Sequence, residues 1–392
     1  MGRFFSGFAA SFVREVLRMR EHPVLVIIAV FLPLSTVLFM YYLFIDGVPR
    51  RLPVAVCDRD NTALSRQIER AVNATPTARV MFHVTSPEEG HHLIVEKKAY
   101  ALIVIPKNYQ RDVQRGLAPA VVNYYNNIYL LPGSLIYKDV ATAIGTISAS
   151  IKGAKLVQSG IMAGRVKDYA VPVNLVSQRL FNPYSNYQYY LSAGFMPTVF
   201  HMFVVLGFMF ALGMEFKEGT AGEWVKASHG SITAALAGKS APYFVCFSVI
   251  GVFMVTMLLR FADTPLEGSS AAIFGALVML ILAGMSVSFF FITVLANLRF
   301  ALSSGAFYTA IAFTFTGLTY PQISMPAGVR YIGEFIPLTH YLRIFIGQSL
   351  RGAPIETTFV PFAMLGLFCV IPFLVMPRWR RIVLDHRYWG GI

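Results

Sequence analysis

The segment Gly238-Lys239-Ser240 has residue types that could bind the phosphates of a nucleotide. In a phosphate-binding loop, backbone N–H groups of a glycine-rich turn hold the phosphates, and the motif has another glycine five residues before its Gly-Lys-Ser. Thr233 stands at that position, and no strand pattern comes before it. The sequence therefore predicts that this chain binds no nucleotide and that the three residues begin a helix at a membrane edge.

His201 is a second candidate for chemistry because it lies inside a long apolar stretch. Ionisable residues at such positions commonly belong to functional sites, so contact with a substrate or a role in proton transfer is one interpretation. A neutral histidine bonded to a neighbouring helix is the other. His83, His91 and His92 lack the spacing of metal ligands. We expect no metal site and no catalytic centre in this chain.

The composition is typical of a membrane protein. The chain has 392 residues, of which 56% are hydrophobic and 14% are charged, whereas a soluble domain has about 25% charged residues. Its net charge of +13 comes largely from arginines placed beside apolar stretches. That placement favours contact with a membrane surface over nucleic acid. We therefore predict an α-helical polytopic membrane protein that binds no nucleic acid.

Six apolar segments are long enough to cross a bilayer as helices. We place these spans at 24–45, 191–213, 241–260, 270–296, 304–322 and 357–376. Arginines close to the first and last spans indicate that both termini are cytoplasmic. They are Arg3, Arg14, Arg18, Arg20, Arg378, Arg380, Arg381 and Arg387. Six spans satisfy this orientation and place the long segment after the first span outside the cytoplasm. The membrane is predicted to be a bacterial inner membrane.

The predicted organisation has five parts. They are an interface helix at 1–22, a first span at 23–45, an extracytoplasmic domain at 46–190, the remaining spans at 191–376 and a cytoplasmic tail at 377–392. Residues 1–22 are predicted to form an amphipathic helix in the cytoplasmic membrane interface. Its aromatic stripe and the arginines beside it are Phe5, Phe8, Phe12, Arg14 and Arg18. Pro23 favours a break before the first span, and a plain extension of that span is the alternative.

The extracytoplasmic domain is predicted to be mixed α/β. Runs of β-forming residues predict four strands, at 53–58, 80–85, 100–106 and 120–125. Thr62 and Ser86 have the sequence context of helix N-caps.

A long helix is predicted from about 133 to 165, with one apolar face. The residues of that face are Ile136, Val140, Ile144, Ile147 and Ile151. Such a helix could hold the domain away from the membrane or line a cleft between subunits. An interfacial aromatic belt before the second span is predicted from Tyr184, Tyr187, Tyr189 and Tyr190.

The loop at 214–240, between the second and third spans, resembles the corresponding loop of the ABC-2-type export permeases. The residues that carry the resemblance are Glu215, Lys217, Glu218, Gly219, Thr220, Glu223, Trp224 and Ser228. In that family the loop is the coupling helix, which docks on a separate ATPase subunit. Ser228-His229-Gly230 departs from the family pattern, in which a proline is usual.

The resemblance continues in the long external insert and in a proline-rich external segment at 321–352. It implies two permease subunits and two cytoplasmic ABC ATPase subunits, with ATP and Mg bound by the ATPases and no cofactor in this chain. It also suggests a periplasmic adaptor protein and an outer-membrane channel as partners, where the host has two membranes. The external segment is implied to be re-entrant, with gate residues Pro321, Met325, Pro326, Pro337, Thr339, Tyr341 and Arg343.

Physical arguments support the coupling role of the 214–240 loop and the gate role of the 321–352 segment. A charged helix anchored by spans on both sides can move as a rigid lever, and Glu215 and Glu218 lie on one face of it. Their expected partners are basic groups of the ATPase or arginines of the helix at 3–20. The prolines of the 321–352 segment prevent one continuous helix, and broken backbone at membrane depth must be buried in protein or line a cavity.

The function predicted from the sequence is the permease subunit of an ATP-driven exporter of a hydrophobic drug-like or lipid-like substrate. Candidate residues of the substrate path are His201, Phe208, Phe290 and Phe315. One alternative is a membrane sensor whose ligand-binding module is the external domain, although only residues 377–392 follow the last span. A membrane enzyme acting on lipids is a further alternative, and an exporter of lipid or polysaccharide differs only in cargo.

Overall fold

The computed structural model describes residues 2–45, 47–128, 130–159, 180–182, 186, 188–262 and 264–388. The chain forms two compact units. Unit 1 is helical and comprises Met1–Gly47 with Arg179–Ile392, and unit 2 is Val48–Gln178. The predicted insert at 46–190 therefore ends later than unit 2, because the segment leading into the second span belongs to the helical unit. Tyr184 and Tyr187 lie outside the described residues.

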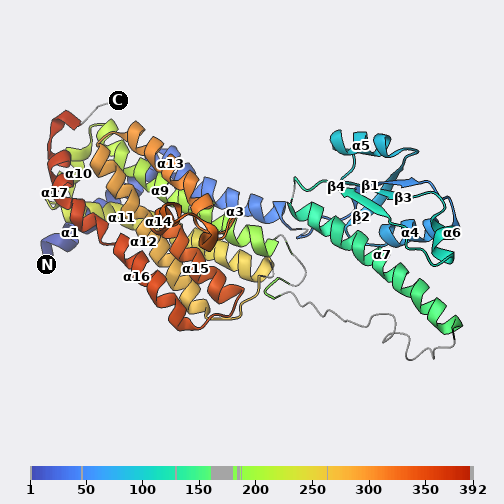
Figure 1. Cartoon of the computed structure of the whole chain (residues 1–392). Coiled ribbons are helices and arrows are strands. Elements are labelled where there is room, and N and C mark those ends of the chain that lie inside the picture. Colours follow the sequence, from blue (N-terminus) through green and yellow to red (C-terminus); the bar gives the residue numbers. More distant parts are fainter. Residues whose placement is uncertain are drawn as a thin grey trace. The chain divides into compact units, whose positions relative to one another are not determined.

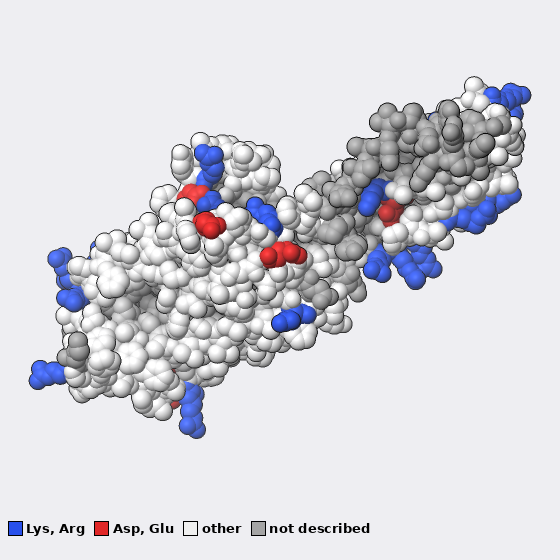
Figure 2. All heavy atoms as spheres, turned by 90° about the horizontal axis from the view of Figure 1, so that it is seen from below, with Lys and Arg blue, Asp and Glu red and all other residues white. Residues whose placement is uncertain are grey.

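Five helical segments of unit 1 are long and apolar enough to cross a membrane. They are Pro23–Leu43, Ala193–Lys217, Ile232–Phe261, Ser270–Leu295 and Ile355–Leu384. The elements within them are α2 (Pro23–Val26), η1 (Ile27–Phe31), α3 (Leu32–Leu43), α9 (Ala193–Lys217), α11 (Ile232–Thr256), η4 (Met257–Phe261), α12 (Ser270–Leu295), η6 (Ile355–Thr358), α16 (Phe359–Phe368) and α17 (Ile371–Leu384). On the face shown in Figure 2, most of the helical surface is uncharged, and Lys and Arg appear in a few separate groups.

The predicted span at 304–322 corresponds to α13 (Leu298–Phe315), which is not among these five segments. Arg299 and several hydroxyl side chains reduce its apolar character, and Gly317, with φ +86°, follows its C-terminal end. α13 forms a tight hairpin with α12, because Ala296 adopts a left-handed conformation and Asn297 caps the next helix. The count of six spans remains a prediction.

Two helices extend beyond the spans that the sequence predicted. α11 begins at Ile232, well before the predicted start at 241, because Ser231 caps it and small residues pack it against another helix. The last helix runs through Pro377 to Leu384. Residues 377–384 are therefore not a free tail, and Trp379 in this part of the chain is fully buried.

The remaining helices of unit 1 are shorter. They are α1 (Gly2–Glu21), η3 (Gln188–Ser192), α10 (Ala221–Ala227), η5 (Gln322–Ser324), α14 (Ala327–Glu334), α15 (Pro337–Ser349) and η7 (His386–Tyr388). The predicted break before Pro23 is confirmed, since α1 ends at Glu21 and α2 starts at the proline.

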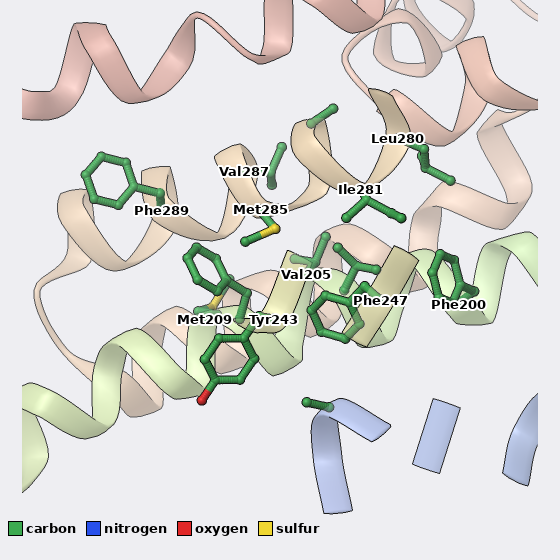
Figure 3. Packing of buried hydrophobic residues seen from close by; sticks show 14 of the residues in the cluster. Phe200, Val205, Met209, Tyr243, Phe247, Leu280, Ile281, Met285, Val287 and Phe289 are labelled. Carbon is green, nitrogen blue, oxygen red and sulfur yellow. The ribbon is translucent and has the colours of Figure 1, made fainter. Parts of the chain in front are cut away.

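The core of unit 1 lies where α9, α11 and α12 meet. Figure 3 shows side chains of these three helices pointing toward one another. Phe208 and Tyr243 make an edge contact with ring centroids 5.9 Å apart. Glycines allow the helices to approach, since a Cβ at Gly251 would lie 2.9 Å from the Leu277 side chain. α9 and α12 are consequently the central helices of the unit (Figure 1).

Unit 2 contains a four-stranded sheet of order β2-β1-β3-β4. Its strands are β1 (Leu52–Asp58), β2 (Ala78–His83), β3 (Ala101–Ile105) and β4 (Val122–Tyr125). β1 is parallel to β2 and β3, whereas β4 is antiparallel to β3. All four strands lie at the positions that the sequence predicted. β1 and β3 are buried on both faces, which explains why they read as continuous apolar runs.

Helices cover both faces of the sheet. They are α4 (Ala63–Asn73), α5 (Pro87–Val95), α6 (Tyr109–Gln114) and α7 (Leu130–Gln158). α5 packs on one face, and α4, α6 and α7 contribute to the core on the other (Figure 1). The predicted caps Thr62 and Ser86 both accept hydrogen bonds from the first turns of their helices.

The apolar face of α7 packs inside its own unit, so it does not line the cleft between subunits that was one of the two suggestions from the sequence. Ile136, Val140 and Ile147 are buried in the core of unit 2, together with Val54 and Ile68. This face therefore holds the helix against its own sheet and α4, and it lines no cleft within the described part of the chain. The residues predicted to extend this helix to 165 lie outside the described residues.

Candidate functional site

α1 packs closely along α11 and α10, and glycines make this contact possible. A Cβ at Gly7 would lie 2.6 Å from the carbonyl oxygen of Ser228. A Cβ at Gly238 would lie 2.5 Å from the carbonyl oxygen of Phe8. Such distances are too short for any larger residue without movement of the backbone, so Gly238 serves helix packing. The Gly-Lys-Ser sequence thus lies inside a helix, well after the start of α11 at Ile232.

Glu215, near the C-terminal end of α9, is the centre of a buried group of charges. Arg14 donates to both carboxylate oxygens, at 2.7 and 3.1 Å. Lys239 lies 2.9 Å away, and Arg18 forms a further ion pair with the same carboxylate. Thr220 donates its hydroxyl to Glu215 at 2.5 Å. This carboxylate is fully buried, and its charge is met by three cations.

Glu15 and Glu218 complete the group. Lys239 lies 2.5 Å from Glu15, which also accepts a hydrogen bond of 2.8 Å from the hydroxyl of Tyr243. Arg18 donates to Glu218 at 2.5 Å. We call the six residues the charge cluster: Arg14, Glu15, Arg18, Glu215, Glu218 and Lys239. Three cations face three carboxylates, so the cluster is balanced, as buried ions must be to offset the cost of leaving water.

Trp224 of α10 lies beside the charge cluster and is buried. Its indole N–H donates to the hydroxyl of Ser11 at 2.9 Å, and Ser11 donates in turn to the carbonyl of Ala235 at 2.8 Å. The Lys239 ammonium lies 5.5 Å from the ring centroid, within the range of a cation–π contact. Trp379 of α17 packs against Trp224 with centroids 6.2 Å apart. One tryptophan thereby connects α10 to α1, α11 and α17.

The outer side of the α10 region is exposed. Lys217, Glu223, Lys226 and His229 are solvent-accessible, whereas Trp224 on the same short helix faces inward. The turns before and after α10 contain Gly219 and Gly230 with positive φ. His229 also has a positive φ, 53°, which a proline ring cannot adopt. The departure from the family pattern at Ser228-His229-Gly230 therefore coincides with a backbone conformation at His229 that excludes proline.

The predicted coupling residues fall into two groups. Glu215, Trp224 and Ser228 are buried within the chain, so they position the segment and offer no surface to a partner. Lys217 and Glu223 are exposed, and Gly219 and Thr220 are half-buried. Of the two partners expected for Glu215 and Glu218, the structure contains the arginines of the N-terminal helix.

The N-terminal helix differs from the prediction in what its faces contact. Arg14 and Arg18, which the sequence placed beside the aromatic stripe, point into the charge cluster. Phe5 is exposed, and Phe8 and Phe12 are half-buried and stacked at 6.3 Å. Sequence reasoning missed the buried ion pair between Lys239 and Glu15. A lysine inside the apolar pattern of α11 was the available signal, since such a charge must have a partner.

The segment at 321–352 forms two short helices, α14 and α15, joined by a turn. Arg343 donates to Glu334 at 2.9 Å through Nη1, forms a second bond to it through Nη2, and donates to Gln322 at 2.7 Å. Gln322 donates to the carbonyl of Phe315 at 3.0 Å, at the end of α13. The bidentate pair between Arg343 and Glu334 therefore joins α15 to α14, and Gln322 connects this pair to the end of α13.

The other predicted gate residues are distributed along these helices. Pro326 precedes α14 and Pro337 begins α15, positions at which proline favours a helix start. Pro321 is exposed and Met325 is buried. Thr339 and Tyr341 are buried, and their hydroxyls have no hydrogen-bond partner among the described residues.

The four residues proposed for a substrate path do not share a pocket among the described residues. His201 and Phe208 are buried in the core between helices. Phe290 lines an apolar groove of about 280 Å³ with Phe291 and Phe335. Phe315 is half-buried and lines none of the described pockets.

Unit 1 contains helices long enough to span a membrane, and α1 and α10 pack together at one end of them. This is the arrangement of a polytopic membrane subunit. A family model described as "ABC-2 family transporter protein" matches residues 23–376. The chain therefore belongs to the ABC-2 transporter family. It is an integral membrane protein and a membrane subunit of an ABC transporter, and its family works with a cytoplasmic ATPase subunit.

Two curated relatives show the same kind of protein. The chain is 22% identical over 318 residues to the linearmycin resistance permease protein LnrN of Bacillus subtilis, covering 76% of this chain and 80% of the relative. It is 24% identical over 342 residues to the inner membrane transport permease YhhJ of Escherichia coli, covering 84% of this chain and 86% of the relative.

Proposed function

We propose that this chain is the permease subunit of an exporter and that the exposed side of the α10 region receives the movement of an ATPase subunit. The observation that supports this proposal is the charge cluster. It joins α1, α9 and α11 at the point where α10 packs against all three. A force applied to the exposed residues of α10 would therefore reach two long membrane helices and the N-terminal helix together.

The cluster has the properties of a rigid joint. Glu215 bonds Arg14, Arg18, Lys239 and Thr220, and Glu15 bonds Lys239 and Tyr243. Packed interfaces with such contacts shift between discrete arrangements and do not deform continuously. ATP-driven closure of the ATPases would then move α10 and the attached helices as one body.

The proposed cargo is hydrophobic, drug-like or lipid-like, and the proposed direction is outward. One relative is named for resistance to linearmycin, and resistance is consistent with removal of a compound from the cell. The apolar groove lined by Phe290, Phe291 and Phe335 supports an apolar cargo.

We propose a dimer of permease subunits with two ATPase subunits, in a bacterial inner membrane with both termini cytoplasmic. The segments Pro23–Leu43 and Ile355–Leu384 have most of their residues unburied within the chain. Lipid or a second subunit must cover these surfaces, and a dimer covers part of them.

The proposal is tested by co-purification from the native host in mild detergent, with ATPase activity measured on the eluate. We expect an ATPase to co-purify, and we expect Glu223→Lys to abolish substrate-stimulated ATPase activity while the unfolding midpoint stays unchanged. Glu356→Lys is the matched control, because Glu356 is also an exposed acid but lies in η6 at the other end of the last span. A preparation without any ATPase would favour the alternative function of a membrane sensor.

A further inference from the structure

A pocket of about 480 Å³ lies at the end of the helical unit opposite α10. The start of α9, the end of α13 and the C-terminal half of α15 form its walls. Its volume is in the range of about 300–1,000 Å³ that is usual for small-molecule sites. None of the roles discussed so far uses this pocket.

Two arginines line the pocket, and their charges are balanced differently. Arg343 is paired with Glu334, so that pair contributes no net charge. The hydrogen bond from Arg343 also lowers the pKa of Glu334, which keeps the carboxylate ionised. Arg351 is exposed, and no acid within the described part of the chain forms an ion pair with it. Among the described residues, the lining of the pocket thus contains one arginine without an ion pair and no carboxylate.

The pocket also has hydrogen-bond donors to offer. A guanidinium has five N–H groups, and Arg343 uses three bonds for Glu334 and Gln322. Its remaining N–H groups have no partner among the described residues. These two N–H groups, on Nε and Nη1, lie on different edges of the guanidinium, and each can donate one hydrogen bond to an oxygen of a phosphate or carboxylate, as can the guanidinium of Arg351.

The other walls of the pocket are apolar. Leu342, Ile346 and Leu350 lie on one side of α15 at helical spacing, and Leu318 packs against Gly194 of α9 on the opposite side. Because the pocket lies at the N-terminal end of the candidate span Ala193–Lys217, it is at the depth where a bilayer changes from hydrocarbon to head groups. A lipid phosphate at that depth can accept hydrogen bonds from the arginines while its acyl chains contact the apolar walls.

We propose that this pocket binds the phosphodiester head group of an anionic membrane lipid. Arg351 and the spare N–H groups of Arg343 hold the phosphate, and the acyl chains lie along Leu342, Ile346 and Leu350. The proposal does not depend on the direction of transport or on the cargo.

The test uses the full-length protein in nanodiscs or detergent and titrates phosphatidylglycerol or phosphatidylcholine by native mass spectrometry. We expect the wild type to prefer phosphatidylglycerol. We expect Arg351→Gln to weaken its binding about tenfold, the order of one charge-assisted hydrogen bond. Ile346→Trp, which fills the pocket but leaves both arginines, should weaken it as well. Arg330→Gln is the matched control, because Arg330 is an exposed arginine of α14 outside the pocket.

Two results would overturn the proposal. Equal binding of phosphatidylglycerol by the wild type and by Arg351→Gln would show that the lipid binds elsewhere. Competition by inorganic phosphate, without any preference between the two lipids, would assign the pocket to a soluble anion. Unfolding midpoints of all variants, measured alongside, distinguish loss of binding from loss of fold.

Discussion

The two ends of α9 use arginine in opposite ways. At the Lys217 end, Arg18 and Lys239 of the charge cluster are buried and Arg14 is 21% exposed, and each of the three has a carboxylate partner from another part of the chain. At the Ala193 end, Arg343 is about one-third exposed and paired, and Arg351 is exposed without an acid. The first arrangement is closed on itself, whereas the second leaves charge available for a ligand.

This difference has an energetic meaning. Breaking a buried ion pair leaves an unpaired charge in a medium of low polarity, which costs about 3–5 kcal/mol. An exposed pair contributes about 0–1 kcal/mol, because water and salt replace the partner. The stability of the fold should therefore depend on the charge cluster. Ligand binding should depend on the pocket lined by Arg343 and Arg351. Variants at each end can break or sharpen this contrast.

The largest effect is expected for Lys239→Met. The substitution leaves Glu15 with only the Tyr243 hydroxyl as a partner and removes one of three cations from Glu215. We expect the free energy of unfolding to fall by about 3–5 kcal/mol, measured by denaturant titration in mixed micelles. The double variant Glu15→Leu with Lys239→Met should recover part of the loss, because it removes a charge of each sign. Wild-type stability for Lys239→Met alone would contradict the closed cluster.

Trp224→Ala should have the next largest effect. It removes a buried ring that contacts Trp379 and Lys239, and the resulting cavity is expected to cost about 3 kcal/mol. Trp224→Phe retains most of the ring contacts and loses the hydrogen bond to Ser11, for a cost of about 1 kcal/mol. Both are measured by the same titration. Similar losses for the two variants would show that the hydrogen bond, and not the packing, makes the larger contribution.

The contrast between the two ends also explains what the sequence could predict. Long apolar helices, the break at Pro23 and the caps at Thr62 and Ser86 depend on neighbours in the chain, and the structure contains them. The partner of Lys239 is Glu15, 224 positions away, and no local pattern specifies that pairing. For the same reason the sequence did not predict that the apolar face of α7 packs on the strands and on α4 of its own unit.

The boundaries missed by the sequence have a related cause. The hydropathy of a segment shows where a helix can cross a bilayer but not where the helix stops. α11 begins early and α17 ends late because their polar ends pack on other helices, through Gly238 and Trp379 respectively. Such tertiary contacts extend helices beyond their apolar stretch.

Glu334→Gln should produce a smaller change than either variant of the cluster. Its side chain is 30% exposed and that of Arg343 is 34% exposed, so we expect a loss of about 0.5–1 kcal/mol. Because the Arg343 hydrogen bond lowers the pKa of Glu334, the stabilisation is complete above the ordinary carboxyl pKa and is lost as the pH falls through the lowered value. Unfolding titrations at a series of acidic pH values should show the wild type and the variant converging. A constant difference down to low pH would exclude the ion pair as its source.

The smallest effect on stability is expected for Arg351→Gln. An exposed residue without an ion pair has little to lose on folding, so the free energy of unfolding should change by no more than about 0.5 kcal/mol. The same measurement on Arg330→Gln provides the baseline for an exposed arginine of this surface. A loss of stability well above that baseline would mean that Arg351 has a structural partner. The charges at the Ala193 end of α9 would then be paired within the chain, as they are in the charge cluster. A loss of stability equal to that baseline, together with weaker binding of phosphatidylglycerol, would assign the charge of Arg351 to a ligand. A group that neither stabilises the fold nor binds a ligand would not distinguish phosphatidylglycerol from phosphatidylcholine.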